Sequence, residues 1–237
     1  MPKSLIIGAT SSLGIAICRQ LGAKGEALVL SGRNHEELTM LARDVSIRYG
    51  VETSTIIFDL ESGNLSVDAL TRDDLDSVYM VIGDMGNNDK HDIHNIERVI
   101  AVNFTAPAKI LTAIASKMEK RRCGHIAIIS SVAGDRGRQS NYPYGSAKAG
   151  LTVFASGLRN RLYPYGVHVM TVKPGFIDTP LTYGINSPLV ASREYVAYQI
   201  IRALAKKKDA IYVPFFWRYI MFIICHIPEK IFKRLGL

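Results

Sequence analysis

The chain has 237 residues, of which 48% are hydrophobic and 21% are charged. This balance excludes a disordered or low-complexity protein and predicts a globular chain with one substantial core. The formal net charge of +8 suits an anionic cofactor or an anionic membrane surface, but the basic residues are not interleaved with aromatic ones, so nucleic-acid binding is not expected.

The cysteines and histidines carry no sign of a metal site. Cys18, Cys123 and Cys225 stand far apart, and the six histidines lack ligand spacing. We therefore expect no metal, reduced thiols and a cytoplasmic location. The apolar run that follows Met1-Pro2-Lys3 is too short for a secretory signal, so export is not expected.

Short aliphatic or β-branched runs alternate with longer helical patterns along the chain. Strands are expected at residues 4–7, 27–30, 53–58, 78–82, 125–130, 167–172 and 210–213. Strands separated by helices form βαβ units around a parallel sheet. The pattern predicts a single domain over residues 1–213: a doubly wound, three-layer α/β/α sandwich of about seven strands, with ligands bound at the carboxyl ends of the strands.

The first expected strand leads into a glycine-containing turn. It reads Gly8-Ala9-Thr10-Ser11-Ser12-Leu13-Gly14 and precedes a helical pattern. Glycine lets backbone amides approach a phosphate, and a helix N-terminus favours negative charge. We expect a dinucleotide to contact Gly8, Thr10, Ser11, Ser12, Leu13 and Gly14. The alternative is a tight structural connection, and Ser12 stands where a third glycine would be favourable.

The second expected strand ends in Ser31-Gly32-Arg33-Asn34. NAD sites usually place an acidic residue here to accept hydrogen bonds from the ribose hydroxyls, and none is present. Arg33 offers a planar, permanently charged group for a 2′-phosphate. The sequence therefore favours NADP(H) over NAD(H), the alternative being an ordinary surface charge.

Tyr144 and Lys148 are four residues apart in a segment that reads as helical, so both side chains face the same way. A free tyrosine has a pKa of about 10. A lysine charge about 4 Å away, at an effective dielectric constant near 20, contributes roughly 4 kcal/mol before solvent losses. We expect Lys148 to lower the pKa of Tyr144 and make it a usable acid/base near neutral pH.

Further motifs follow in a fixed order. Ser131 lies thirteen residues before Tyr144, Asn103 stands in Val102-Asn103-Phe104, Asp59-Leu60 follows the third expected strand, and Pro174-Gly175-Phe176-Ile177-Asp178-Thr179 follows the sixth. In this order they resemble the short-chain dehydrogenase/reductase family over nearly the whole chain. The resemblance implies a Rossmann-like fold, a nicotinamide cofactor and a homo-oligomer, either dimer or tetramer.

The resemblance also implies roles for individual residues. Tyr144 would exchange a proton with the substrate, Lys148 would hold the nicotinamide ribose, Ser131 would position the substrate oxygen, and Asn103 would hold a water that links Lys148 to solvent. The residues implied in cofactor binding beyond the first turn are Arg33, Asp59, Leu60, Gly83, Tyr144, Lys148, Pro174, Ile177 and Thr179. One departure stands out, because Gly83-Asp84-Met85-Gly86 replaces the family's Asn-Asn-Ala-Gly segment.

Residues 214–237 form a distinct C-terminal segment. It contains the single Trp, many large apolar side chains, and the basic residues Lys230, Lys233 and Arg234. Pro214 and Pro228 bracket a run too short for a membrane-spanning helix. A lid, an oligomer contact and a helix at an anionic membrane surface are the alternatives. The segment resembles a membrane-associated subgroup that includes reductases of a decaprenylphosphoryl keto-pentose.

The sequence therefore predicts an NADP(H)-preferring oxidoreductase that acts on a small or lipid-like carbonyl or secondary alcohol. Its substrate pocket is expected between residues 132–143 and 181–193. One alternative is a reductase of a lipid-linked keto-sugar at the cytoplasmic membrane surface. Another, from a different class, is a dinucleotide-binding sensor or scaffold without catalysis.

Overall fold

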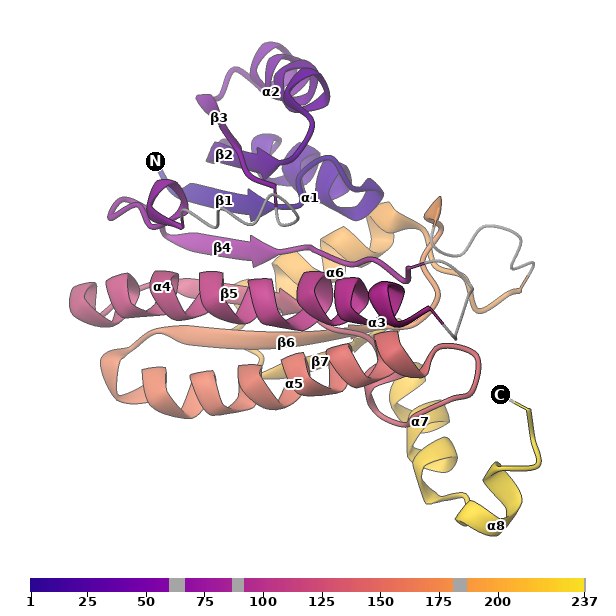
Figure 1. The fold of residues 1–237 in the computed structure, drawn as a ribbon. Helices are drawn as coiled ribbons and strands as arrows, with labels where there is room; N and C mark the ends of the chain where they lie inside the picture. The colour runs from indigo at the N-terminus through magenta and orange to yellow at the C-terminus, as the bar shows by residue number, and fades with distance from the viewer. Residues whose placement is uncertain (60–66, 87–91, 181–186, 237) are drawn as a thin grey trace.

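A computed structural model of the chain describes residues 1–59, 67–86, 92–180 and 187–236. Its centre is a seven-stranded parallel sheet in the order β3-β2-β1-β4-β5-β6-β7 (Figure 1). The strands are β1 (Lys3–Ile7), β2 (Ala27–Gly32), β3 (Thr53–Ile57), β4 (Ser77–Met80), β5 (His125–Ile129), β6 (His168–Pro174) and β7 (Ala210–Val213). The strand order reverses between β1 and β4, where such sheets bind their ligands.

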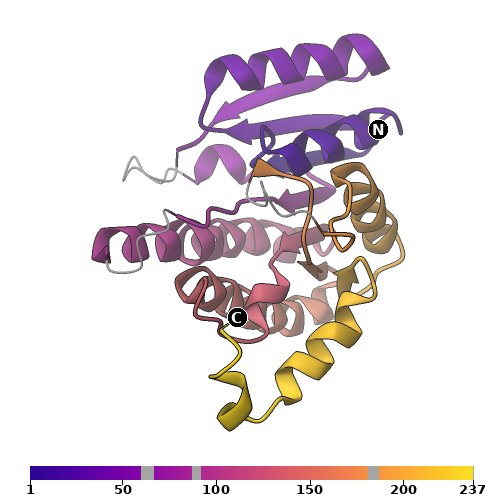
Figure 2. The same cartoon turned by 90° about the vertical axis from the view of Figure 1, so that its right-hand side faces the viewer.

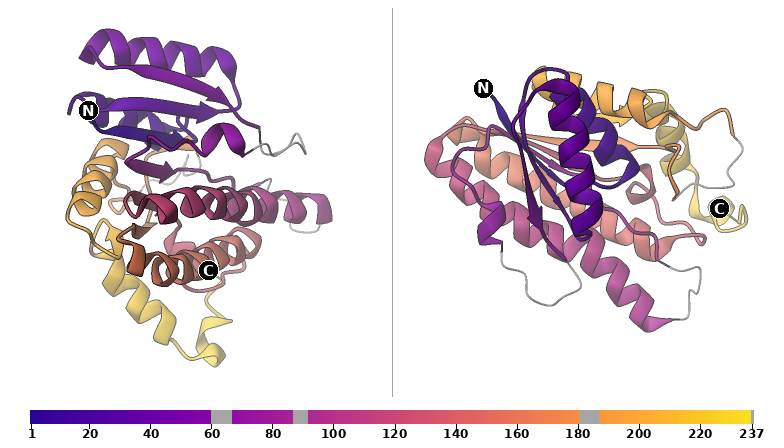
Figure 3. Two further views of the ribbon diagram at one scale, coloured as in Figure 1. Left: turned by 90° about the vertical axis from the view of Figure 1, so that its left-hand side faces the viewer. Right: turned by 90° about the horizontal axis from the view of Figure 1, so that it is seen from above.

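Helices cover both faces of the sheet, as Figure 3 shows. One face carries α1 (Ser12–Gly22), α2 (His35–Tyr49) and α6 (Arg193–Ala205), and the other carries α4 (Ala106–Arg121) and α5 (Tyr142–Leu162). A single-turn π-helix, η2 (Ala101–Thr105), joins α3 (Ile93–Ile100) to α4. The short helices are η1 (Asp68–Leu70), η3 (Val132–Gly134), η4 (Tyr163–Tyr165), α7 (Trp217–His226) and α8 (Glu229–Phe232).

The residues before several helices explain where the helices begin. The side chains of Ser11, Asn34, Asp92 and Ser192 each accept a hydrogen bond from a backbone amide in the first turn of α1, α2, α3 and α6, respectively. Such caps satisfy amides that have no partner within the helix. Because α1 and α2 follow directly on β1 and β2, their capped ends lie at the carboxyl edge of the sheet.

Alternation along the strands divides the core between the two faces. In β1, Ile6 packs with the cluster under α1, α2 and α6, whereas Leu5 and Ile7 pack with the cluster under α4 and α5. In β5, Ile126 and Ile128 join the second cluster while Ala127 joins the first. Strands buried on both faces need continuous apolar sequence, which is what these strands have.

The predicted fold class is confirmed: the chain forms a Rossmann-like α/β sandwich with seven parallel strands. The seventh strand matches its predicted bounds, and the others shift by one or two residues at their ends. The predicted fourth strand at 78–82 is β4, which ends at Met80. The Val81 amide still donates to the Ile7 carbonyl at 2.8 Å, and Val81 and Ile82 line the ligand cleft.

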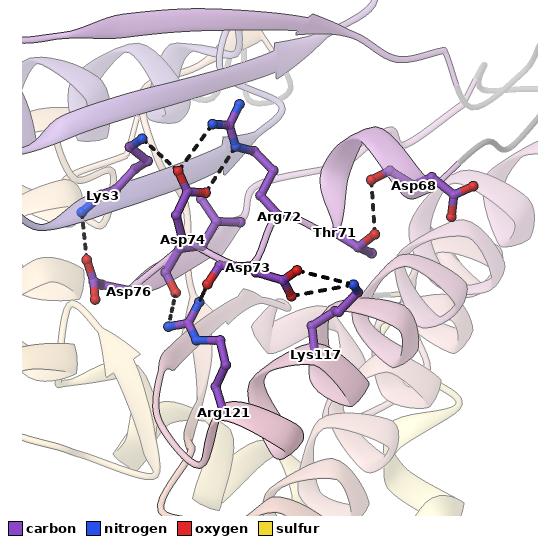
Figure 4. Close-up of polar contacts among 10 residues, drawn as sticks. Lys3, Asp68, Thr71, Arg72, Asp73, Asp74, Asp76, Lys117 and Arg121 are labelled. Carbon is purple, nitrogen blue, oxygen red and sulfur yellow. Dashed lines mark hydrogen bonds and ion pairs between the residues drawn. The ribbon is translucent and has the colours of Figure 1, made fainter.

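A cluster of polar side chains fastens the sheet at the amino ends of β1 and β4, opposite the ligand edge (Figure 4). The Lys3 amide and ammonium donate to Asp76 and Asp74 at 2.8 and 2.7 Å. Arg121, at the end of α4, donates to the carbonyls of Asp73 and Leu75. Arg121 therefore ties α4 to the loop before β4.

The C-terminal segment packs beside the carboxyl edge of the sheet (Figure 2). Trp217 and Met221 of α7 are buried against Val132, while Phe176, Tyr212 and neighbouring side chains complete the cluster. The division of the chain after residue 213 stays a prediction. Within the described ranges, length and composition single out the continuous helix Ile93–Arg121 as able to cross a membrane, and half of its apolar window is buried in the fold.

Candidate active site

A continuous cleft runs along the carboxyl ends of the strands. One part, of about 550 Å³, lies over β1 and β2, and a second part, of about 380 Å³, lies over β5 and β6. Both parts are lined by Thr10, Ser11, Val81, Ile82 and Gly83. An extended ligand could therefore reach from the end of β2 to the end of β6 without crossing the sheet.

The turn after β1 forms the floor where the two parts meet. Gly8 has φ of +87°, and a Cβ there would lie 2.8 Å from the Val81 carbonyl oxygen. The Ser11 hydroxyl donates to the Gly8 carbonyl at 2.7 Å and accepts from the Gly14 amide at 3.0 Å. Ser12 and Leu13 open α1 and line the second part of the cleft. This arrangement fits a pyrophosphate, because a narrow glycine turn brings the positive end of a helix to the cleft.

The end of β2 lines the far end of the cleft. Arg33 lines it, as predicted, together with Asp59. The Ser31 hydroxyl is fully buried there and has no hydrogen-bond partner among the described residues. Glu37, in the first turn of α2, also lines this end and was missed by the sequence analysis. Leu60 lies outside the described residues.

Asn103 braces the segment after β4, where the family pattern is altered. Its amide nitrogen donates to the carbonyls of Val99 (2.8 Å) and Asp84 (2.6 Å), and its oxygen accepts from the Asp84 amide (3.1 Å). The Asp84 carboxylate accepts from the Gly86 amide at 2.8 Å and pairs with Arg98. The acidic residue in this altered segment therefore closes its own turn and ties it to α3.

Gly83 brings Asn103 and Lys148 to the same point of the cleft. A Cβ at Gly83 would lie 3.8 Å from the Lys148 ammonium nitrogen and 3.9 Å from the Asn103 oxygen. The two side chains therefore face one backbone position. The bridging water expected between them stays a prediction.

The three other catalytic candidates meet where β5 ends and α5 begins. Ser131 and Tyr144 both line the second part of the cleft, and the Ser131 hydroxyl accepts from the Ala133 amide at 3.1 Å. Lys148 is one turn further along α5, with its nitrogen 5.7 Å from the centre of the Tyr144 ring. Its buried ammonium donates to the carbonyls of Ile82 (2.8 Å) and Ile129 (3.1 Å). The helical spacing predicted from sequence thus brings all three into one pocket.

The expected electrostatic effect of Lys148 on Tyr144 was wrong for this structure. Burial raises the pKa of Tyr144 to about 12, and the nearby Ser131 side chain only partly opposes this rise. Burial also lowers the pKa of Lys148 to about 7. The lysine nitrogen faces backbone carbonyls and the ring rather than the phenolic oxygen, so desolvation outweighs the attraction between charges. Tyr144 is therefore protonated at neutral pH.

The loop after β6 closes the second part of the cleft. Pro174, Ile177 and Thr179 line it, as predicted. Gly175 lies directly under the Trp217 ring, and a Cβ at this glycine would lie 1.9 Å from the indole nitrogen. From sequence, Gly175 belongs to the motif after the sixth strand. In the structure, α7 packs so closely against this position that only glycine, which has no side chain, fits there.

The loop between Ser131 and Tyr144 supplies a further wall. Arg138 and Asn141 line the cleft, whereas Asp135 and Arg136 bind other parts of the protein. From sequence, all three charged residues could touch substrate, and nothing in the sequence separates them. The distinction follows from contacts with β6, β7 and the end of α7. Residues 181–186 of the second predicted wall lie outside the described residues.

Comparisons with known proteins agree with this geometry. A family model described as short chain dehydrogenase matches residues 3–189. An uncharacterised oxidoreductase of Streptomyces coelicolor is 32% identical over 242 residues, covering 99% of this chain and 96% of that protein. A 3-oxoacyl-[acyl-carrier-protein] reductase of Aquifex aeolicus is 31% identical over 187 residues, covering 76% of this chain and 75% of that protein.

Solved structures show the same fold at lower identity. The bulky-bulky ketone specific alcohol dehydrogenase of Comamonas testosteroni has a TM-score of 0.83 at 22% identity, with 97% of this chain and 96% of that chain covered. A short-chain dehydrogenase of Sphingobium yanoikuyae in complex with NADPH has the same TM-score and identity, with 97% of each chain covered. These similarities extend over the C-terminal segment.

Proposed function

Because the chain belongs to the short-chain dehydrogenase family and is an oxidoreductase of that family, we propose that it reduces a ketone to a secondary alcohol with NADPH. The observation that carries this proposal is the meeting of Ser131, Tyr144 and Lys148 in a pocket that continues into the nucleotide cleft. A sensor or scaffold without catalysis has no chemical need for that arrangement.

The cleft supplies the groups that would hold a dinucleotide. The turn from Gly8 to Gly14 would bind the pyrophosphate, Arg33 would meet a 2′-phosphate, and Lys148 would hold the nicotinamide ribose. When bound, the nicotinamide supplies or accepts a hydride. Ile177 and Thr179 would border it on the β6 side.

Tyr144 would hold and deliver the proton that accompanies reduction. The carbonyl oxygen of a ketone gains negative charge as its carbon is reduced, so it needs a donor within hydrogen-bond reach. The Ser131 and Tyr144 side chains line the same part of the cleft, so a substrate oxygen placed between the two hydroxyls would be held by both. Asn103 would act as a positioning residue through the Gly83 segment.

Tyr144 would enter the reduction in its protonated form. With a pKa of about 12, it carries its proton at neutral pH, so a proton is available for the substrate oxygen. Lys148, with a pKa of about 7, is poised to exchange a proton at the same pH. The positive charge of Lys148 would stabilise the phenolate left after proton delivery.

NADPH, rather than NADH, is expected to be consumed when the purified protein is mixed with a panel of aliphatic and aromatic ketones. Replacing Arg33 with serine is expected to weaken NADPH binding roughly tenfold to a hundredfold, the range for one charge-assisted contact, and to leave NADH binding unchanged. Loss of nicotinamide absorbance and calorimetric titration provide the measurements.

Arg43→Ser is the matched control, because Arg43 is an exposed arginine of α2 that does not line the cleft. Tighter binding of NADH by the unaltered protein would contradict the role of Arg33 and would point instead to Glu37. Binding of both nucleotides without turnover of any ketone would favour the sensor alternative.

A membrane-surface location is the second proposal, and it is supported by the exposed face of α7. Phe215, Tyr219, Phe222 and Ile223 are 64–70% exposed on or beside one helix, and basic residues flank them. The exposed basic residues are Arg218, Lys230, Lys233 and Arg234. A helix with this composition suits the boundary of an anionic membrane, which would give access to a lipid-linked ketone such as a keto-sugar.

Sedimentation with vesicles tests the membrane proposal without truncating the chain. The unaltered protein is expected to sediment with phosphatidylglycerol vesicles, and the double variant Phe222→Ser/Ile223→Ser is expected to sediment several-fold less. Ile47→Ser, which removes an exposed side chain from α2 (85% exposed), is the control and should sediment normally. Equal sedimentation of all three proteins would exclude a membrane role for α7.

A further inference from the structure

Arg138 is a charged side chain in the wall of the substrate pocket, and the residues that the structure describes give it no ionic partner. It lies on the loop between Ser131 and Tyr144 and lines the same 380 Å³ pocket as both of them. Apolar side chains, including Met85, Val132 and Phe176, make up much of the surrounding wall. A guanidinium in such surroundings needs an acceptor.

The hydrogen bonding of Arg138 leaves this need unmet. Its Nη2 donates to the Met221 sulfur at 3.3 Å, which is a weak acceptor. Its Nε is buried and has no partner among the described residues. No carboxylate of the described chain forms an ion pair with it. Burial lowers the pKa of the Arg138 guanidinium, which reflects the cost of keeping the charge in this position.

The neighbouring charges are already engaged elsewhere. The Asp135 carboxylate accepts from the Lys173 ammonium at 2.5 Å and from the Tyr212 hydroxyl at 2.8 Å. The Glu229 carboxylate accepts from Arg136 at 3.0 Å. Neither acid forms an ion pair with Arg138, so its guanidinium remains available to a ligand.

Arg136 provides a contrast within the same loop. It donates to the carbonyls of Ile224, Cys225 and Ile227 at 2.7–3.0 Å, and its guanidinium lies 3.8 Å from the centre of the Phe232 ring. Those contacts close the end of α7 and explain Arg136 as a structural residue. Arg138 has no comparable set of contacts, although it lies only two residues further on.

We propose that Arg138 binds an anionic oxygen group of the substrate, a carboxylate or a phosphate ester, while the ketone of the same molecule reaches Tyr144. The inference rests on the proposed reductase function. It narrows the substrate class to oxo acids and keto phosphate esters that carry an apolar portion between or beside the ketone and the anionic group. A buried, unsatisfied donor is costly, and a bound oxyanion would satisfy it through charge-assisted hydrogen bonds.

The test compares three probes with the same apolar chain: hexanol, hexanoate and hexyl phosphate. Calorimetry is carried out on the full chain with saturating NADPH, so that the nucleotide end of the cleft is filled, and again without it. At least one of the two anions is expected to bind roughly tenfold to a hundredfold more tightly than hexanol. The tighter of the two identifies the carboxylate or the phosphate ester as the natural group.

Two arginine variants decide whether Arg138 causes the preference. Arg138→Met is expected to abolish the preference for the anion and to leave hexanol binding unchanged. Arg218→Met removes the same charge from the exposed surface of α7 and should keep the preference. Three outcomes would each overturn the proposal. The unaltered protein could bind all three probes equally, Arg138→Met could keep the preference for the anion, or Arg218→Met could lose it.

Thermal unfolding gives a readout that a purely structural role would not produce. Arg138→Met is expected to unfold at the same temperature as the unaltered protein or higher, because it removes a desolvated charge without an ionic partner. A lower unfolding temperature would assign Arg138 to packing. These binding and unfolding measurements need no turnover, so failure of the anion site and failure of the reductase function give different results.

Discussion

Replacing Tyr144 with phenylalanine is expected to lower the rate of ketone reduction about a hundredfold to ten-thousandfold, the usual contribution of a positioned acid. The substitution removes only the hydroxyl. The ring, whose centre lies 5.7 Å from the Lys148 nitrogen, remains in place. Single-turnover mixing of the variant, NADPH and a ketone measures the loss at the chemical step, and calorimetry checks that NADPH binding is retained.

Tyr142→Phe is the matched control. Tyr142 lies on the same first turn of α5 but is 43% exposed, so its hydroxyl is not expected to serve the reaction. Comparable rates for Tyr144→Phe and Tyr142→Phe would remove Tyr144 from the chemistry. A large loss in both variants would instead indicate a general disturbance of the α5 N-terminus.

Replacing Lys148 with methionine is expected to change how stability depends on pH. The pKa of Lys148 is about 7 in the folded protein and about 10.4 in an unfolded chain. Between these values the unfolded chain binds more protons, so the contribution of Lys148 to the free energy of unfolding rises with pH. Between pH about 7 and about 10.4, this contribution to the free energy of unfolding increases by an amount on the order of 4 kcal/mol. The increase is lost as the pH falls to about 7.

Urea unfolding from pH 6.5 to 10 measures this effect as the difference between the unaltered protein and Lys148→Met. The difference is needed because Tyr144 and Cys18 also titrate. Burial raises their pKa values, so their contribution to the free energy of unfolding falls as pH rises. Lys120→Met, at an exposed position of α4, is the control and should leave the pH dependence unchanged. A constant difference between the protein and Lys148→Met would show that Lys148 is not desolvated in the folded state.

The architecture and the main site residues follow from sequence because both depend on local patterns. Apolar runs separated by helical patterns predict the sheet, and the carboxyl ends of parallel strands must share one edge. Ser131, Tyr144 and Gly8 each follow a strand or begin a helix at that edge. Their meeting is therefore a consequence of topology rather than of any single side-chain contact.

Features that depend on packing between distant segments were not predictable. The rise in the pKa of Tyr144 follows from desolvation by several surrounding segments, whereas the spacing of Tyr144 and Lys148 reports only one neighbour. Asp84 is held by Arg98 of α3 and Asn103 of η2, which follow it in the chain and pack against its turn. Arg136 is structural because it binds the end of α7, whereas Arg138 is not held there. The sequence near these two arginines does not indicate where α7 ends.

The attachment of α7 to the loop before Tyr144 has a consequence for how relatives of this protein can diverge. Arg136 holds the end of α7, Met221 meets Arg138, and Trp217 covers Gly175, so the last segment of the chain helps to shape the substrate pocket. The nucleotide cleft over β1 and β2 includes none of these contacts. Exchanging the final helices between relatives would therefore change the support behind the substrate pocket and leave the cofactor site as it is, whereas trimming them would uncover Gly175 and remove the contact between Met221 and Arg138.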